Sequence, residues 1–439
     1  MKTVTIATLG CKANQFDSEV LATSLEERGY QVVPFGEEAE ITIINTCTVT
    51  HRADFESRQL IRKAIRYNPN SLIILTGCYA QTQPDLLVPL KEVRYLLGNK
   101  EKLHLPELLP ALIRGEAPRV QVSEIQRETP LFEKLIPSFR SHTRAFLKIQ
   151  DGCDARCSYC IVPYARGPSR SLPLDKVIGY LNMFKEKGFK EVVLTGIHIG
   201  SYGMDLHPPV TLDQLLEEIE HQETPSRIRL SSIEPQEFSP HLMNLLTRSK
   251  KLCPHVHLPI QSGDEKILKR MNRPYDPSFL YDLIMKIHQT LPKASIGADI
   301  LVGFPGEGER EFMQTYQLIH SLPISYLHVF PYSVRRRTEA ANLSGKVDEK
   351  EIKRRAEVMR ELGRKKRKAF YSQFLHQDLE VLIEDRKETG TERRMGLSRN
   401  YIPVVLLQGV CVEINQEIKV RVVDVNEKVV FGKVAYGDR

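Results

Sequence analysis

The chain has 439 residues, a formal net charge of +7 at pH 7 and a hydrophobic fraction of 41 %. This length is sufficient for two or three domains, each with a core of its own. Apolar runs stay well below the eighteen or so residues that a membrane span needs, and a strand-like pattern starts at residue 3. We therefore expect a cytoplasmic protein without a signal peptide and without membrane contact.

Residues 1–115 alternate between short apolar runs and amphipathic stretches. The pattern predicts helices at 14–29 and 53–66, and strands at 3–9, 41–45, 71–76 and 93–97. Strands separated by helices favour a doubly wound parallel sheet with helices on both faces. In such a sheet, ligands bind beyond the carboxyl ends of the strands.

Three cysteines follow strands of this predicted sheet: Cys11, Cys47 and Cys78. We expect them at one edge, each before a helix whose N-terminus favours the thiolate. Gly10 and Gly77 precede two of them and allow the backbone to bend tightly. Three convergent thiolates favour a [4Fe-4S] cluster with one iron left open. The alternative is a set of buried structural cysteines.

A connecting segment is predicted at 116–138, and strand–helix alternation resumes over 139–371. The strands of this second domain are predicted at 144–149, 191–194, 227–230, 255–258, 295–301 and 326–330. Six strands rather than eight favour an open (β/α)6 barrel, in which the chemistry lies on the loops that follow the strands. Cys253 and Cys411 have no partners at ligand spacing and are predicted to be core thiols.

The loop after the first of these strands carries Cys153, Cys157 and Cys160. A structural zinc ion requires four protein ligands, and the loop holds no fourth cysteine or histidine. Three thiolates on a cubane of four irons instead leave one iron open. A zinc knuckle or three unrelated buried cysteines is the alternative. The spacing closely resembles the cluster loop of the radical S-adenosylmethionine enzymes, where the open iron binds the methionine amino and carboxyl groups.

This resemblance implies six positions on the barrel loops that bind S-adenosylmethionine. Gly196 is expected near the methionine group, and Ser231 and Glu234 near the ribose and the sulfonium. Gln261 and Gly303 are expected near the adenosyl group, and Tyr159 near the adenine. Taken one at a time, these residues are equally expected as turn formers. His198 lies in the same predicted pocket, and we expect a structural role for it.

The stretches around the first cysteines, 9–19, 45–50 and 76–81, resemble those of the methylthiotransferases. In that family, a second cluster holds or passes on the sulfur that is inserted into the substrate. Lys12-Ala13-Asn14 resembles the subgroup that acts on N6-threonylcarbamoyladenosine in tRNA. We hypothesise that the Lys12 ammonium pairs with the threonyl carboxylate, with Asn14 as a further substrate contact; a solvated lysine is the alternative. One departure is Arg337, where the family usually has glycine.

After a basic stretch at 350–368, residues 372–439 predict a small closed β-barrel with strands at 379–383, 393–397, 401–406, 417–425 and 429–434. Its segment 395–401 resembles the signature of TRAM domains, which bind RNA. Tyr401 is expected to stack on a base, and Arg393 and Arg399 are expected to contact phosphates. The alternative is a barrel that only packs on the other domains.

The resemblance covers nearly the whole chain and implies an enzyme. We expect methylthiolation of C2 of N6-threonylcarbamoyladenosine at position 37, with two [4Fe-4S] clusters and S-adenosylmethionine as cofactors. The expected partners are the tRNA anticodon loop, a sulfur donor, and an electron donor such as a flavodoxin or ferredoxin. Two alternatives remain open. One is the same chemistry on isopentenyladenosine-37 or on a ribosomal protein, and the other is an RNA-binding iron–sulfur sensor without turnover.

Overall fold

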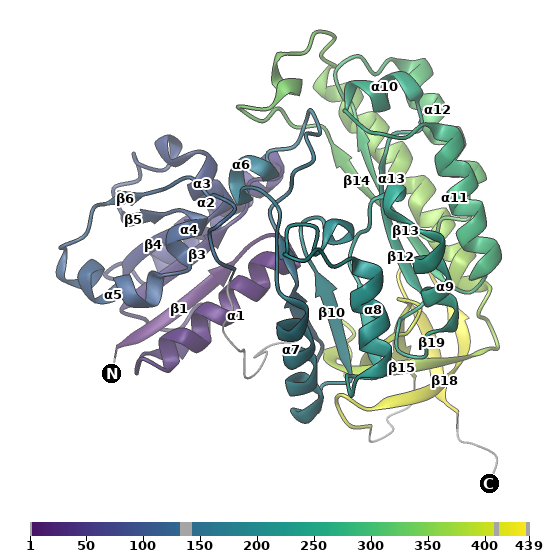
Figure 1. The fold of residues 1–439 in the computed structure, drawn as a ribbon, viewed down its shortest axis with the longest axis horizontal. Helices are drawn as coiled ribbons and strands as arrows, with labels where there is room; N and C mark the ends of the chain where they lie inside the picture. Colours follow the sequence, from purple (N-terminus) through teal and green to yellow (C-terminus); the bar gives the residue numbers. More distant parts are fainter. Residues whose placement is uncertain (1, 132–142, 408–411, 436–439) are drawn as a thin grey trace.

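The computed structural model describes residues 2–131, 143–407 and 412–435. The chain forms an N-terminal domain, a central open barrel and a C-terminal β-barrel, which run from purple through green to yellow in Figure 1. The predicted core thiol Cys411 lies outside the described residues. None of the helices in the described part of the chain combines the length and the apolar character needed to cross a bilayer.

The N-terminal domain is built on one parallel sheet with the strand order β2-β1-β3-β4-β5-β6. Its strands are β1 (Thr3–Thr8), β2 (Gln31–Val33), β3 (Ile41–Thr46), β4 (Leu72–Gly77), β5 (Val93–Leu97) and β6 (Val120–Gln121). Its helices are α1 (Lys12–Glu26), α2 (His51–Tyr67), α3 (Cys78–Thr82), α4 (Asn99–Lys102) and α5 (Leu105–Arg114). The four predicted strands and the doubly wound sheet are confirmed.

The edge strands β2 and β6 were not predicted, because two or three residues are too few to show a period. Strand β6 pairs with β5, so the sheet continues into the stretch predicted as a connecting segment. The domain boundaries at 115, 138 and 371 therefore stay predictions.

The central domain contains the six predicted strands, all parallel: β7 (Ala145–Lys148), β10 (Glu191–Thr195), β11 (Arg227–Leu230), β12 (His255–Gln261), β13 (Ser295–Val302) and β14 (Tyr326–Pro331). They form two ladders, β11-β10-β7 and β12-β13-β14. The ladders meet where the Ile233 amide donates to the His257 carbonyl at 3.0 Å. The short strands β8 (Gln150–Asp151) and β9 (Arg170–Ser171) flank α6 (Val162–Arg166).

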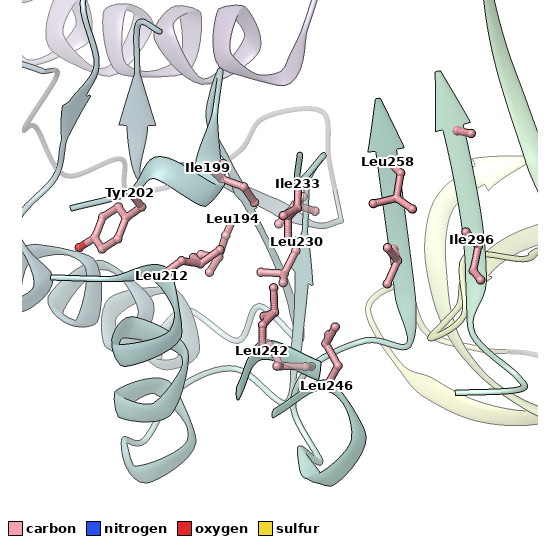
Figure 2. Close-up of a cluster of buried hydrophobic side chains, with 14 of the residues drawn as sticks. Leu194, Ile199, Tyr202, Leu212, Leu230, Ile233, Leu242, Leu246, Leu258 and Ile296 are labelled. Carbon is pink, nitrogen blue, oxygen red and sulfur yellow. The ribbon is translucent and has the colours of Figure 1, made fainter. Parts of the chain in front are cut away.

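Helices cover the outside of this open barrel (Figure 1): α7 (Leu174–Glu186), α8 (Leu212–His221), α9 (Pro240–Arg248), α10 (Glu265–Arg270), α11 (Pro277–Thr290), α12 (Glu309–Ser321) and α13 (Glu349–Ser372). Figure 2 shows strand side chains such as Leu194 and Leu230 packed against Leu212 of α8 and Leu242 of α9. Phe16 of α1 belongs to the same core. The N-terminal domain is therefore packed directly against the central one.

Side chains in β12, β13 and β14 alternate between the outer core and the inner face of the open barrel. Leu258, Ile296 and Leu327 belong to the core. Since neighbouring side chains of a strand point to opposite faces, the inner face carries polar groups that include His257 and Asp299.

The C-terminal domain is a closed barrel with the order β15-β16-β17-β19-β18, as predicted. Its strands are β15 (Asp378–Lys387), β16 (Arg394–Ser398), β17 (Pro403–Leu406), β18 (Glu417–Val425) and β19 (Val430–Val434). Phe370 and Tyr371 at the end of α13 enter its core. The basic helix therefore leads directly into the barrel.

Candidate functional site

The first triad (Cys11, Cys47 and Cys78) lies at one edge of the N-terminal sheet, as predicted. Cys11 caps α1, Cys47 follows β3, and Cys78 begins α3 directly after β4. Gly10 has φ +101°, and a Cβ at this position would lie 3.0 Å from the Cys47 sulfur. A glycine is therefore needed for the loops of Cys11 and Cys47 to approach.

Burial and the neighbouring Cys78 raise the pKa of Cys47 to about 12. The predicted stabilisation of a thiolate by a helix N-terminus is outweighed here, because α2 begins only at His51. Buried thiols of this kind lose their protons when a metal cation binds them. The electrostatics of the first triad thus suit a metal centre.

The second triad (Cys153, Cys157 and Cys160) lies in the loop between β8 and α6. Gly152 has φ +75°, and a Cβ there would lie 1.9 Å from the Pro168 carbonyl oxygen. Arg273 Nη1 donates to the Cys157 sulfur at 3.3 Å. Burial, with Cys157 beside it, raises the pKa of Cys160 to about 12. A ring nitrogen of His198, Nδ1, lies 3.6 Å from the Cys153 sulfur.

The width of the triads bears on which metal they fit. Among the described residues, the sulfur atoms of neither triad all lie within 4.8 Å of one another. A tetrahedral zinc ion with sulfur bonds of about 2.3 Å needs sulfur atoms about 3.8 Å apart. Both triads are therefore wider than one zinc ion requires, which favours a larger centre such as an iron–sulfur cluster.

A cavity of about 190 Å³ borders the second triad and the loop that follows Cys47 of the first. The loop after Cys47 contributes Val49 and Thr50, and the second triad contributes Cys160. The remaining lining residues are Tyr159, Ile161, Gln261, Asp299, Leu301, Phe330, Pro331, Tyr332 and Ser333. Two of the predicted cofactor residues, Tyr159 and Gln261, therefore meet at one cavity.

The other predicted cofactor residues have distinct surroundings. Ser231 Oγ is buried and, within the described structure, has no hydrogen-bond partner. Glu234 is paired with Arg273, and burial raises the pKa of this carboxyl. Gly196 leaves room for the Gln150 side chain, whose Oε1 accepts from the Ile197 amide at 3.0 Å. An unpaired hydroxyl beside a held carboxylate suits the hydroxyls of a bound ribose.

Gly303 does not face the cavity. It has φ +78°, and a Cβ there would lie 2.4 Å from Ile352 of α13. Its amide donates to Glu307 Oε1 at 2.8 Å. The glycine therefore allows α13 to pack closely, and its expected contact with the adenosyl group stays a prediction.

His198 lies beside the second triad. Burial alone would lower its pKa, but hydrogen bonds to Cys153 and Glu237 raise the pKa of His198 to about 10. Its Nε2 lies 2.5 Å from Glu237 Oε1. These two contacts favour the expected structural role of His198, which stays a prediction.

Lys12 is half-buried at the start of α1. Burial, together with the cations Arg144 and Arg229, lowers its pKa to about 8. Within the described residues, the Lys12 ammonium forms neither a hydrogen bond nor an ion pair. A half-buried cation of this kind suits an anionic ligand.

Asn14 has a different role from the one predicted. It is 1 % exposed, and its amide donates to the carbonyls of Leu9 at 2.7 Å and Thr46 at 3.1 Å. Its oxygen accepts from Arg166. Asn14 therefore holds the loops of the first triad together, and no group of its side chain is left for a substrate.

Two of the residues predicted to contact RNA, Arg399 and Tyr401, have partners in the central domain, so their RNA contacts stay predictions. Arg399 donates to the carbonyls of Ser226 at 3.1 Å and Lys250 at 2.5 Å, in the central domain. The Tyr401 ring lies 4.2 Å from the His255 ring, on the inner face of the open barrel. Both side chains dock the two domains together. Arg393 is exposed and free of the central domain, so its phosphate contact stays a prediction.

The departure at Arg337 preserves a glycine-like backbone. Arg337 has φ +73°, the left-handed conformation that glycine adopts without strain. Its guanidinium lies 4.8 Å from the centre of the Tyr164 ring. The neighbouring Arg335 is buried and pairs with Asp54 of α2 at 2.5 Å, so it joins two domains.

A buried ionic network between the domains was not predicted. Asp17 of α1 contacts Lys102 at 2.7 Å, Lys148 at 2.5 Å and Arg166 at 3.1 Å, and Arg166 also contacts Asp151 at 2.9 Å. These cations outweigh burial and hold the pKa of Asp17 well below its usual range. Asp17 and Asp151 lie within recognisable motifs, but the three cations follow no pattern in the sequence.

Two parts of the chain match models of known families. Residues 3–98 match the family described as uncharacterized protein family UPF0004, and residues 147–319 match the radical SAM superfamily. The solved structure of the radical S-adenosylmethionine methyltransferase TsrM from Kitasatospora setae is similar in fold. It has a TM-score of 0.59 and 16 % sequence identity over 77 % of this chain and 74 % of that one.

Curated relatives match over most of their length. The threonylcarbamoyladenosine tRNA methylthiotransferase MtaB of Aquifex aeolicus is 39 % identical over 90 % of this chain and 96 % of its own. The protein of the same name from Bacillus subtilis is 40 % identical over 92 % and 90 %. A tRNA-2-methylthio-N(6)-dimethylallyladenosine synthase of Moorella thermoacetica is 34 % identical over 91 % and 90 %.

Proposed function

The chain belongs to the threonylcarbamoyladenosine tRNA methylthiotransferase family, and on this premise we propose that it methylthiolates C2 of N6-threonylcarbamoyladenosine at position 37 of tRNA. The observation that carries the proposal is the cavity bordered by loops of both triads. A target base in this cavity would lie beside Cys160 and the loop that follows Cys47. The match to relatives of this activity over at least nine-tenths of their length supports the same substrate.

Each triad is suited to one [4Fe-4S] cluster with an iron free of protein ligands. When bound, the clusters and S-adenosylmethionine supply radical chemistry and the methylthio group. Such chemistry is required because the C2–H of adenine is neither acidic nor electrophilic enough for ordinary acid–base substitution. The chain's own part is to bind the base and the cofactor and to exclude water from the cavity.

Three residues have defined tasks at the cofactor. Ser231 Oγ offers an unused hydrogen-bonding group for a ribose hydroxyl. Glu234 is oriented by Arg273, which donates from Nη1 at 3.2 Å. Because the same Arg273 nitrogen also donates to Cys157, it couples the ribose pocket to the second triad.

Lys12 supports the choice of substrate. The threonyl group carries a carboxylate, and an isopentenyl group carries no charge. Pairing with the carboxylate would satisfy the half-buried ammonium, whose pKa of about 8 reflects burial among other cations. The second candidate is the same reaction on isopentenyladenosine. The 34 % identity to the tRNA-2-methylthio-N(6)-dimethylallyladenosine synthase of Moorella thermoacetica supports it.

The other partners follow from this chemistry. Radical cleavage of the cofactor consumes an electron, so we propose an electron donor such as a flavodoxin or ferredoxin. A sulfur donor must restore the atom that each turnover removes. The tRNA would enter through its anticodon loop, in the cytoplasm.

The proposal is tested by mass spectrometry of tRNA nucleosides from cells that lack this activity, with and without this gene. We expect the 2-methylthio form of threonylcarbamoyladenosine to appear only with the gene, and not with its Cys157→Ala variant. Methylthiolated isopentenyladenosine instead would replace the substrate and keep the chemistry. Unchanged tRNA in iron-replete cells would reject the proposal and favour a ribosomal protein substrate or a sensor.

A further inference from the structure

A chain of polar side chains crosses the inner face of the open barrel. Tyr326 Oη lies 2.8 Å from His255 Nε2 and 2.9 Å from His257 Nδ1. His257 Nε2 lies 2.8 Å from Asp299 Oδ1, and His328 Nδ1 lies 3.2 Å from the same oxygen. The chain thus runs from a buried histidine to a histidine whose side chain is 52 % exposed.

The direction of each hydrogen bond follows from the buried end. Burial holds the pKa of His255 well below its usual range, so this ring is neutral. Its Nδ1 is buried and has no hydrogen-bond partner in the described structure. We therefore assign the unprotonated nitrogen of the ring to Nδ1. Nε2 therefore carries the proton and donates to Tyr326. The Tyr326 hydroxyl then donates to His257 Nδ1, and His257 Nε2–H donates to Asp299.

The packing maintains this chain. A Cβ at Gly297 would lie 2.4 Å from the Tyr326 hydroxyl oxygen and 2.6 Å from His257 Nδ1, so only glycine leaves room for their contact. At the buried end, the Tyr401 ring covers His255. At the other end, Asp299 can only accept, so His328 donates from Nδ1, and the tautomer with its proton on Nδ1 presents Nε2 as an acceptor.

His328 lies at the margin of the cavity. Asp299 and Phe330 line the cavity, and the His328 ring packs edge-on against Phe330 with 6.5 Å between ring centres. Within the described residues, His328 Nε2 has no partner. The network therefore ends in one oriented acceptor beside the site where the target base is proposed to bind.

We propose that His328 is a specificity-determining residue whose Nε2 accepts a hydrogen bond from the N6 substituent of the target adenosine. The inference rests on the proposed function, and it identifies His328 as the residue that recognises the N6 substituent. A threonylcarbamoyl group offers a carbamoyl N–H and a hydroxyl as donors, whereas an isopentenyl group offers neither. A site with a fixed acceptor favours the substrate that satisfies it.

The test measures binding and turnover separately, using the cluster-loaded enzyme at pH 8. Anticodon stem-loops carry threonylcarbamoyl-, glycylcarbamoyl- or isopentenyladenosine, and affinities are measured by fluorescence anisotropy. His328→Phe is expected to weaken binding of the threonylcarbamoyl stem-loop about tenfold, the effect of one hydrogen bond, and to leave isopentenyl binding unchanged. His328→Gln, which retains an acceptor, is expected to restore part of the loss.

The controls separate specificity from folding. His320→Phe replaces a histidine on the outer helix α12 and is expected to change neither affinity. Release of 5′-deoxyadenosine without tRNA should be equal in wild type and His328→Phe. A loss that persists with the glycyl form assigns the donor to the carbamoyl N–H, and a loss confined to the threonyl form assigns it to the hydroxyl.

Two results would overturn the inference. One is an equal loss of affinity for all three stem-loops, which would make His328 only structural. The other is a preference for the threonylcarbamoyl stem-loop that requires added Zn²⁺ and disappears with a chelator. In that case His257, Asp299 and His328 would hold a cation. If wild type binds the stem-loops selectively but never methylthiolates them, the proposed function fails while the affinities still decide the role of His328.

Discussion

Asp17 and Arg166 form a buried ion pair, 3.1 Å long, between the helix that follows Cys11 and the helix that follows Cys160. Arg166 also contacts Asp151, whose Oδ1 accepts from the Gly152 amide at 2.9 Å. On the other side, Asn99 accepts from Lys102 at 2.9 Å and lies 3.8 Å from the Cys78 sulfur. Fixed contacts therefore connect the loops that carry the two triads.

Asp17→Asn removes the carboxylate and leaves three cations facing one another. Breaking a buried ion pair from one side costs about 3–5 kcal/mol, so we expect a fall of this order in the free energy of unfolding. Because Asp17 has a lowered pKa, its contribution is complete above the usual aspartate pKa and declines as the pH falls below about 4.

The measurement is the thermal unfolding midpoint of both proteins between pH 3 and pH 7. The wild type should lose more stability on acidification than Asp17→Asn, so that the gap between the two curves narrows from about pH 4 toward pH 3. Parallel curves would mean that Asp17 is not the carboxylate responsible.

Cys157→Ala is expected to abolish formation of 5′-deoxyadenosine and to halve the iron content, since the first triad is untouched. Cys253→Ala is the matched control, because Cys253 is a buried core thiol outside both triads. Iron and acid-labile sulfide are measured beside cofactor cleavage. Full iron content in Cys157→Ala would contradict the assignment of the second triad.

Lys12→Met should lower the affinity for the threonylcarbamoyl stem-loop about tenfold, because one charge-assisted hydrogen bond is lost. The isopentenyl stem-loop should bind equally well or better. Lys346→Met, at an exposed position, is the control. Equal affinities in wild type and Lys12→Met would leave Lys12 as an ordinary half-buried lysine.

Tyr401→Ala and Arg393→Ala should separate docking from RNA binding. Tyr401 packs on His255, so its loss is expected to lower the free energy of unfolding by about 2–4 kcal/mol. Arg393→Ala should leave stability unchanged and reduce the slope of log affinity for tRNA against log salt concentration by about 1. Salt titrations of tRNA binding and unfolding midpoints decide between the two roles.

Arg337→Gly should be tolerated or slightly stabilising, because glycine adopts φ +73° without strain. The loss of the contact with Tyr164 offsets part of this gain, so we expect a change of at most about 1 kcal/mol. Arg336→Gly is the control and should cost about 0.5–1 kcal/mol, since a flexible residue is introduced without relief of strain. Thermal unfolding of the three proteins measures the difference.

The sequence by itself determined the fold class, the longer strands of all three domains and the placement of both triads, whereas the two- and three-residue strands β2, β6, β8 and β9 were missed. These features depend on local information: apolar runs between amphipathic helices mark a parallel sheet, and a residue that directly follows a strand must lie at its carboxyl edge. Cys11, Cys47 and Cys78 are far apart along the chain, yet strand order alone brings them to one edge.

Only the tertiary structure decided which of the remaining polar residues face the site. Asn14 and Gly303 lie in or beside motifs and take part in packing, and Arg399 and Tyr401 lie in a segment that resembles an RNA-binding signature yet dock onto the central domain. The ion pairs of Asp17 and the chain of groups that ends at His328 join strands and helices distant in sequence. Burial and charge pairing depend on how the domains pack together, and no local pattern in the sequence encodes that packing.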